Sequence, residues 1–147
     1  GIMQSNRHHL DLALHKLLAL GKRRIGFIGL SFKTGTDDLR ESPLVTLAEQ
    51  LIGKGMQLSI YDPEVHLASL LGANRSFIEK HLPHIGQMMR SEIEEVIAES
   101  EVLVIGLAGQ EIAGTLATLC RSEQIVLDLV RLPDPAAIPA SVEGLCW

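Results

Sequence analysis

The sequence predicts an α/β protein, with a three-layer α/β/α fold built on an open, all-parallel sheet. Three observations carry this prediction. Short apolar runs rich in Ile, Leu and Val recur along the 147 residues, which is typical of strands buried on both faces. Segments with helical spacing of apolar residues alternate with these runs. Aromatic residues make up only 3% of the chain, so aliphatic side chains must form the core.

A leading helix is expected over residues 5–20, because leucines recur along this segment at helical spacing. Ser5 or Asn6 can cap its start, since both side chains accept hydrogen bonds from free backbone N–H groups. Gly21 is suited to end it. The chain therefore enters its first strand from a helix.

A strand–helix–strand unit follows the leading helix. The apolar run over 23–30 predicts a buried strand, and a polar loop extends from it to Ser42. The next helix is expected to begin at Pro43, because Ser42 is a suitable N-cap and proline is tolerated at the first helical position. Gly53 ends that helix, and a second strand is predicted over 56–61.

The second half of the chain continues the alternation. Two short helices are expected over 65–71 and 76–82, interrupted by Gly72 and Pro83. Ser91, with a glutamate three residues later, forms a capping-box pattern that predicts a helix to Glu99. The remaining predicted elements are a strand over 102–107, a helix over 109–121, a strand over 124–130 and a short edge strand within 142–147.

This order of elements predicts a Rossmann-like open parallel sheet with strand order 2-1-3-4. In such sheets, ligands bind beyond the carboxyl ends of the strands, where the strand order reverses. Here that point is the loop 31–42, which follows the first strand. We therefore expect the functional site at this loop.

The loop carries two cations, Lys33 and Arg40, shortly before a helix begins. The free N–H groups of a helix N-terminus favour an anion. Lysine supplies a point charge, and arginine can hold an anion with two parallel hydrogen bonds. A phosphate site is one interpretation. The alternative is that both cations pair with the acidic residues of the same loop, Asp37, Asp38 and Glu41.

Other candidate residues carry weaker signals. Asp62 ends the second strand, where an acid can hold a ribose, but Asp-Pro after a strand is also typical of a turn. Cys120 lies among apolar helical positions and is expected to be a packed thiol, whereas Cys146 lies near the end of the chain. Arg131 follows the fourth strand and is expected to be a solvated charge. No metal site is predicted, because the histidines of the leading helix have no cluster of acidic or cysteine ligands beside them.

Composition excludes several function classes. The net charge is −5, so no generic binding to nucleic acid or to an acidic membrane surface is expected. No apolar run approaches the length that spans a bilayer. Two distant cysteines and the absence of a signal-peptide pattern predict a cytoplasmic protein. The opening Gly1-Ile2-Met3 is expected to be either a tag remnant or a cut inside a longer chain.

The loop also carries a resemblance to a known family. The segment 29–43, GLSFKTGTDDLRESP, and its continuation to Tyr61-Asp62-Pro63 resemble the signature that opens the C-terminal domain of the UDP-glucose/GDP-mannose dehydrogenases. The residues of this segment and the ending EGLCW are most similar to those of the members that oxidise GDP-mannose. A UDP-glucose-oxidising member and a stand-alone nucleotide-binding module are the alternatives.

The resemblance implies an NAD-dependent oxidoreductase of three parts. An N-terminal domain holds NAD, a central helix forms the homodimer, and the C-terminal domain closes over the sugar nucleotide. It implies that residues 1–21 are the end of the central region and that residues 22–147 are the C-terminal domain.

The same resemblance assigns roles to the two cations of the loop. Lys33 matches the lysine that contacts the sugar nucleotide, and Arg40 matches the arginine that reaches NAD in the neighbouring domain. The family's NAD fingerprint and catalytic cysteine segment have no match in this chain. No catalytic residue is therefore expected here, and the isolated chain is expected to be inactive.

Overall fold

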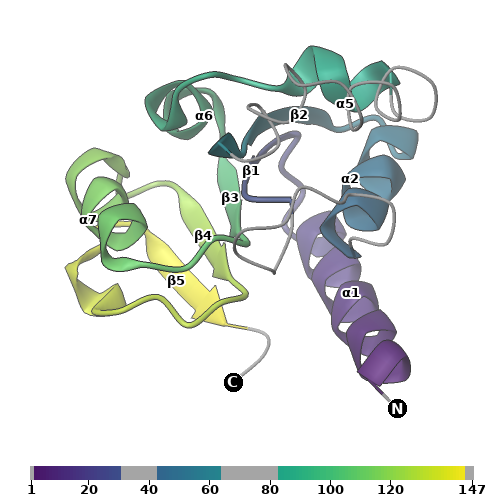
Figure 1. Cartoon of the computed structure of the whole chain (residues 1–147), viewed down its shortest axis with the longest axis horizontal. Helices are drawn as coiled ribbons and strands as arrows, with labels where there is room; N and C mark the ends of the chain where they lie inside the picture. The colour runs from purple at the N-terminus through teal and green to yellow at the C-terminus, as the bar shows by residue number, and fades with distance from the viewer. Residues whose placement is uncertain (1, 31–42, 64–82, 145–147) are drawn as a thin grey trace.

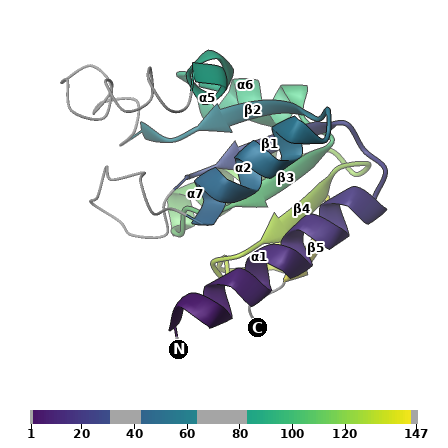
Figure 2. The ribbon, with the colours of Figure 1, turned by 90° about the vertical axis from the view of Figure 1, so that its right-hand side faces the viewer.

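The computed structural model describes residues 2–30, 43–63 and 83–144. It contains a five-stranded parallel sheet in the order β2-β1-β3-β4-β5, with helices on both faces (Figures 1 and 2). The predicted α/β/α fold is confirmed, and a fifth strand extends the predicted order. The elements are α1 (Ile2–Ala19), β1 (Arg24–Ile28), α2 (Pro43–Gly53), β2 (Gln57–Tyr61), α5 (Pro83–Met88), α6 (Ile93–Glu99), β3 (Val102–Ile105), α7 (Gln110–Leu119), β4 (Ile125–Asp128), η1 (Pro135–Ala137) and β5 (Ser141–Gly144).

Side chains alternate between the two faces of the sheet, and each face has its own hydrophobic cluster. Phe27 of β1 packs in the cluster beneath α1 and α2, whereas its neighbour Ile28 packs in the cluster beneath α6 and α7. The same alternation recurs in β3, where Val104 and Ile105 face opposite clusters. A strand that is buried on both faces has no polar side to show in its sequence, which is why these strands read as continuous apolar runs.

Helix α1 packs on the sheet through its second half. Ala13 and Leu17 are buried in the first cluster, and Lys16 Nζ lies 2.9 Å from Glu143 Oε1 on β5. The helix begins at Ile2, so Ser5 and Asn6 lie inside it, and the prediction that one of them caps its start is wrong. The residues before Ser5 include Met and Gln, which favour helix, so nothing stops it there.

β2 ends at Tyr61 as predicted, but β1, β3 and β4 end earlier than the apolar runs predicted. β1 ends at Ile28, although Leu30 is still fully buried. β4 ends at Asp128, although Leu129 is buried as well. The chain leaves the sheet at these points but stays in the core, so hydrophobicity continues past the last ladder hydrogen bond. The pattern therefore predicts where these strands lie but not where they end.

One local prediction around α5 and α6 is wrong. Pro83 is the first residue of α5, a place that suits proline because the first helical N–H needs no partner. Glu92, not Ser91, is the N-cap of α6, and it makes no side-chain cap hydrogen bond. The hydroxyl of Ser91 instead lies 3.4 Å from Glu95 Oε1. The helices predicted over 65–82 lie outside the described residues.

Candidate functional site

The carboxyl ends of the strands form one continuous edge. The register places Tyr61, Ile28, Ile105 and Asp128 side by side across four strands. The strand order reverses between β1 and β3, because the chain passes from β1 outward to β2 and returns to β3 on the other side. This is the position at which ligands bind in open parallel sheets. Lys33 and Arg40, the predicted site residues, lie outside the described residues, but both flanks of their loop are described.

The first flank is held by a buried carboxylate. The backbone N–H of Gly29 donates to the carbonyl of Tyr61 at 2.7 Å. The N–H of Leu30, the next residue, donates to Asp62 Oδ2 at 2.8 Å. Asp62 is only 3% exposed, and a carboxylate at that depth is stable only with hydrogen-bond donors around it. Asp62 thus fastens the exit of β1 to the end of β2, in agreement with the turn interpretation of Asp-Pro.

At the second flank of the loop, two glycines allow neighbouring segments to approach closely. A Cβ atom at Gly106 would lie 2.3 Å from Leu44 Cδ1 and 3.0 Å from the carbonyl oxygen of Gly29. Gly29 has a φ of +96°, and a Cβ there would lie 2.6 Å from Leu107 Cγ. The ends of β1 and β3 and the first turn of α2 therefore meet with no room for a further methyl group.

This contact brings the start of α2 to the edge. Helix α2 begins at Pro43, as predicted, and Leu44 in its first turn is fully buried. In a parallel α/β unit the helix that follows a strand starts at the carboxyl edge, so the positive end of its dipole lies there. Backbone N–H groups in the first turn of a helix can donate to an anionic ligand group such as a phosphate.

A second buried carboxylate organises the exit of β4. Asp128 is 0% exposed, and it accepts the N–H of Val130 on Oδ1 at 2.9 Å and the N–H of Leu132 on Oδ2 at 2.8 Å. Arg131, between these two donors, has a φ of 56° and is exposed, in agreement with a solvated charge. Sequence reasoning missed Asp128. Its only signal is an acid inside an apolar run, which is unusual unless the acid is bonded there.

Negative charge is unevenly distributed along the carboxyl edge. Burial raises the pKa of Tyr61, and nearby carboxylates raise it further, first Glu111 of α7 and then Glu92 and Glu94 at the start of α6. Tyr61 therefore stays a neutral phenol at pH 7. Because these carboxylates repel anions, a phosphate is favoured on the α2 side of the edge rather than between α6 and α7.

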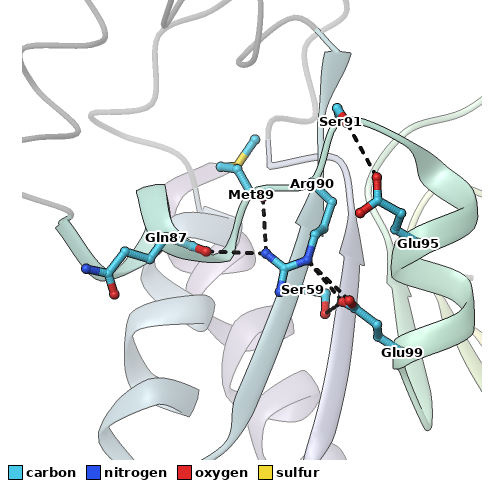
Figure 3. Close-up of polar contacts among 7 residues, drawn as sticks. All are labelled: Ser59, Gln87, Met89, Arg90, Ser91, Glu95 and Glu99. Atoms are coloured by element: carbon cyan, nitrogen blue, oxygen red, sulfur yellow. Dashed lines mark hydrogen bonds and ion pairs between the residues drawn. The ribbon is translucent and has the colours of Figure 1, made fainter.

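A polar cluster outside the edge links α5, α6 and β2 (Figure 3). The Ser59 hydroxyl donates to Glu99 Oε2 at 2.6 Å, and Arg90 Nε lies 3.1 Å from the same oxygen. The bond from Ser59 is the main reason that the pKa of Glu99 is lowered, and the charge of Arg90 adds to it. Arg90 also donates through Nη1 to the carbonyls of Gln87 and Met89. These hydrogen bonds join residues within the cluster, and they hold the segment after α5 against the sheet.

Cys120 is a packed thiol, as predicted. It follows the last residue of α7 and is 6% exposed within the second hydrophobic cluster. Burial raises its pKa to about 11, so it stays protonated at pH 7 and is a poor nucleophile. Cys146 lies outside the described residues. In the described part of the chain, no three His, Cys, Asp or Glu residues gather in a way that could hold a metal ion.

The fold and this edge define an α/β domain of the Rossmann-like class. Residues 26–135 match the UDP binding domain of the UDP-glucose/GDP-mannose dehydrogenase family. The chain belongs to this family. Within residues 2–30, 43–63 and 83–144, no helix combines the length and the apolar character that crossing a membrane requires.

Curated relatives and solved structures agree with this membership. The chain is 44% identical to the GDP-mannose 6-dehydrogenase of Pseudomonas aeruginosa and 40% identical to that of Azotobacter vinelandii, over 99% of its own length in each case. A crystal structure of a ternary complex of the Pseudomonas aeruginosa GDP-mannose dehydrogenase matches with a TM-score of 0.83 and 43% identity, covering 99% of this chain and 33% of that one. A UDP-glucose dehydrogenase from Pyrobaculum islandicum shares the fold, with a TM-score of 0.71 and 23% identity.

The match is to one part of those relatives. The chain spans about one third of their length, 33% for both GDP-mannose 6-dehydrogenases.

Proposed function

We propose that this chain is the C-terminal, sugar-nucleotide-binding domain of an NAD-dependent GDP-mannose 6-dehydrogenase. Such an enzyme oxidises the C6 alcohol of GDP-mannose to the carboxylate of GDP-mannuronate, a precursor of alginate, by two hydride transfers. The observation that carries the proposal is 44% identity to a GDP-mannose 6-dehydrogenase across 99% of this chain. The carboxyl edge described above supports it, because it offers an anion site where a nucleotide diphosphate can bind.

In this proposal the domain binds and orients the substrate, and it supplies no catalytic residue. Lys33 neutralises phosphate charge beside the N-terminus of α2. A charge-assisted hydrogen bond of this kind is worth about 1.5–3 kcal/mol. Binding energy gained at the nucleotide, far from the reacting carbon, fixes the sugar relative to the catalytic cysteine elsewhere in the enzyme. Cys120 is unsuited to that role because it is buried and protonated.

The described residues do not fit an NAD site of their own. Asp62 stands where such domains place the acid that binds a ribose, but it is buried and bonded to the N–H of Leu30. The sequence between β1 and α2 also contains no GxGxxG pattern, which is typical of the glycine-rich turn that holds a pyrophosphate. NAD, which accepts hydride when bound, is therefore held by the preceding part of the full-length protein in this proposal. Arg40 is the residue of this chain that reaches it.

We further propose that residues 1–21 are the end of the helix that forms the homodimer and that residues 22–147 are the binding domain of a cytoplasmic enzyme. Two features of α1 support this division. Its second half is buried against the domain through Ala13 and Leu17. Its first half projects past the other elements (Figure 1), so the chain before it can join on the side of the carboxyl edge.

The proposal is tested in the full-length protein with Lys33→Ala and the control Lys54→Ala. Lys54 is an exposed lysine just after α2, far from the edge along the helix. We expect Lys33→Ala to raise the KM for GDP-mannose by about 10- to 100-fold, the equivalent of one lost charge-assisted contact, while Lys54→Ala leaves it unchanged. Unchanged kinetics in Lys33→Ala would contradict the role of Lys33.

Two alternatives predict other results. A UDP-glucose 6-dehydrogenase would turn over UDP-glucose and not GDP-mannose; the relative of that name in Bacillus subtilis is 39% identical, but over only 37% of this chain. A stand-alone nucleotide-binding module would bind GDP or UDP tightly in calorimetry and reduce no NAD. The wider match to GDP-mannose 6-dehydrogenases favours the first proposal over both.

A further inference from the structure

We infer that residues 87–90 form a strap that closes the outer edge of β2 against pairing with a second copy of this chain, and that Arg90 holds the strap in place. β2 is the first strand in the sheet order, so no named strand lies on its outer side. Such an edge presents backbone groups that can pair with an extended segment of another molecule. The inference does not depend on the proposed function, because it concerns the side of the sheet and not its carboxyl edge.

The hydrogen bonds of β2 show which of its residues face outward. The N–H of Gln57 and the carbonyl of Tyr61 bond to residues that flank β1. Successive residues of a strand turn their backbone groups to opposite sides, so Leu58 and Ile60 present theirs to the outer side. β2 contains no charged residue and no proline, the residues that commonly prevent edge pairing. Protection of this edge therefore depends on a cover.

The strap provides this cover at the middle of the outer edge. Met89 forms a parallel bridge with Ile60, and the N–H of Arg90 donates to the carbonyl of Ile60 at 2.7 Å. Met88 and Met89 also pack, partly buried, against the first hydrophobic cluster. A strand from another molecule must displace the strap before it can pair with Ile60.

The side chain of Arg90 ties the strap to the rest of the domain (Figure 3). Its Nη1 donates to the carbonyls of Gln87 and Met89 at 3.3 Å and 3.2 Å, within the strap. Its Nε donates to Glu99 Oε2 on α6 at 3.1 Å, and the Ser59 hydroxyl of β2 donates to the same oxygen at 2.6 Å. A single bridge is too short to hold an extended segment by itself. Because one side chain joins the strap, α6 and β2, its loss should release the strap.

Release of the strap leaves an edge that suits a second copy of the same strand. Leu58 and Ile60 are apolar, and no charge within β2 repels an identical β2. Two such edges can pair antiparallel about a twofold axis, the commonest symmetry of protein dimers. The strap prevents this contact in the wild type.

The test compares the full-length wild type with Arg90→Ala and with the control Arg121→Ala. Arg121 also pairs with one carboxylate, that of Glu123 at 2.8 Å, but it lies in the turn before β4, and both variants lose one positive charge. Hydrogen exchange at the amide of residue 90 reports release of the strap. We expect its protection to fall by about 10-fold or more in Arg90→Ala, as for one lost charge-assisted hydrogen bond, and to stay unchanged in Arg121→Ala. Sedimentation should show a species of twice the wild-type mass in Arg90→Ala alone.

Gln57→Lys in the Arg90→Ala background checks that the new contact uses β2. Gln57 is the exposed first residue of β2, and lysine on an edge strand opposes pairing. We expect this double variant to return to the wild-type mass while the amide of residue 90 stays poorly protected. Glu99→Ala breaks the same network from α6, and it replaces Arg90→Ala, with the same expectations, if that variant does not fold.

The outcomes separate the parts of the inference. Unchanged protection at residue 90 would overturn the role of Arg90, and lost protection without a heavier species would show that the edge needs no cover. A heavier species that also forms in Arg121→Ala, or that persists with Gln57→Lys, would overturn the inference as well. None of these measurements uses a substrate, so a failure of the proposed function is distinguished from a failure of this inference.

Discussion

The two edges of the sheet are built differently, although both bind backbone N–H groups with carboxylates. At the amino edge, Glu101 Oε1 lies 3.2 Å and 3.4 Å from the N–H groups of Arg24 and Arg23, and all three residues are in contact with solvent. At the carboxyl edge, Asp62 and Asp128 also accept hydrogen bonds from backbone N–H groups, but both side chains are buried. The same bond geometry is thus exposed on one side and desolvated on the other.

The glycines show the same contrast. Gly21 and Gly55 turn the chain at the amino edge with positive φ, and a Cβ at either would meet nothing within 4 Å. Gly29 and Gly106 at the carboxyl edge would place a Cβ within 3 Å of neighbouring atoms. The amino edge therefore only reverses the chain, whereas the carboxyl edge fixes the exits of β1 and β3 in place. A binding site needs such fixed exits, because its residues must be held before the ligand arrives.

The largest effect expected from this contrast is at Asp128. Asp128→Ala removes two buried hydrogen bonds to a charged group, each worth about 2 kcal/mol, so the free energy of unfolding should fall by about 4 kcal/mol. Glu101→Ala, its counterpart at the amino edge, should leave the denaturation midpoint nearly unchanged, because exposed interactions contribute little. Urea unfolding of both variants measures the difference. Equal losses would mean that the two edges do not differ in the way described.

The next effect compares two glycines with similar backbone. Gly29 has a φ of +96° and Gly55 a φ of +85°, so alanine at either position is strained by about 1 kcal/mol. Only Gly29→Ala also overlaps neighbouring atoms, which adds about 2 kcal/mol. Thermal unfolding should therefore place Gly29→Ala well below Gly55→Ala. A smaller loss in Gly29→Ala would show that the exits of β1 and β3 can relax.

The smallest effect is a pH dependence at the amino edge. Hydrogen bonds from the backbone of Arg24, and then of Arg23, lower the pKa of Glu101 from its usual 4.5. A carboxyl whose folded pKa is lowered stabilises the protein above its unfolded pKa, and this contribution disappears as the pH falls through the folded value. Tm should thus decline slightly less between pH 5 and pH 3 in Glu101→Gln than in the wild type. An identical decline in both would assign no stabilising role to the ionised Glu101.

Sequence reasoning succeeded where one property repeats along the chain. Alternating apolar runs and helical spacings gave the parallel sheet, the strand order through the fourth strand and the helix start at Pro43. It failed where position depends on a distant partner. Leu30 and Leu129 are as apolar as strand residues but have left the sheet, and Glu92 rather than Ser91 is the N-cap of α6.

The candidate site divides in the same way. Cations before a helix start left open both a phosphate site and pairing with the acidic residues of the loop. Lys33 and Arg40 could be selected because the motif that contains them resembles a known family, and their roles stay predictions. Asp128 and the contact between Leu44 and Gly106 could not. Their function depends on which atoms meet after folding, and no local pattern records that Leu44 Cδ1 occupies the space a side chain at Gly106 would need.

The most direct test of the account is the oxidation of GDP-mannose by the full-length protein, followed as NADH formed per sugar nucleotide consumed. We predict two NADH for each GDP-mannose, as expected for conversion of an alcohol to a carboxylate, and little or no NADH from UDP-glucose under the same conditions. NADH from UDP-glucose alone, or none from either substrate, would contradict it.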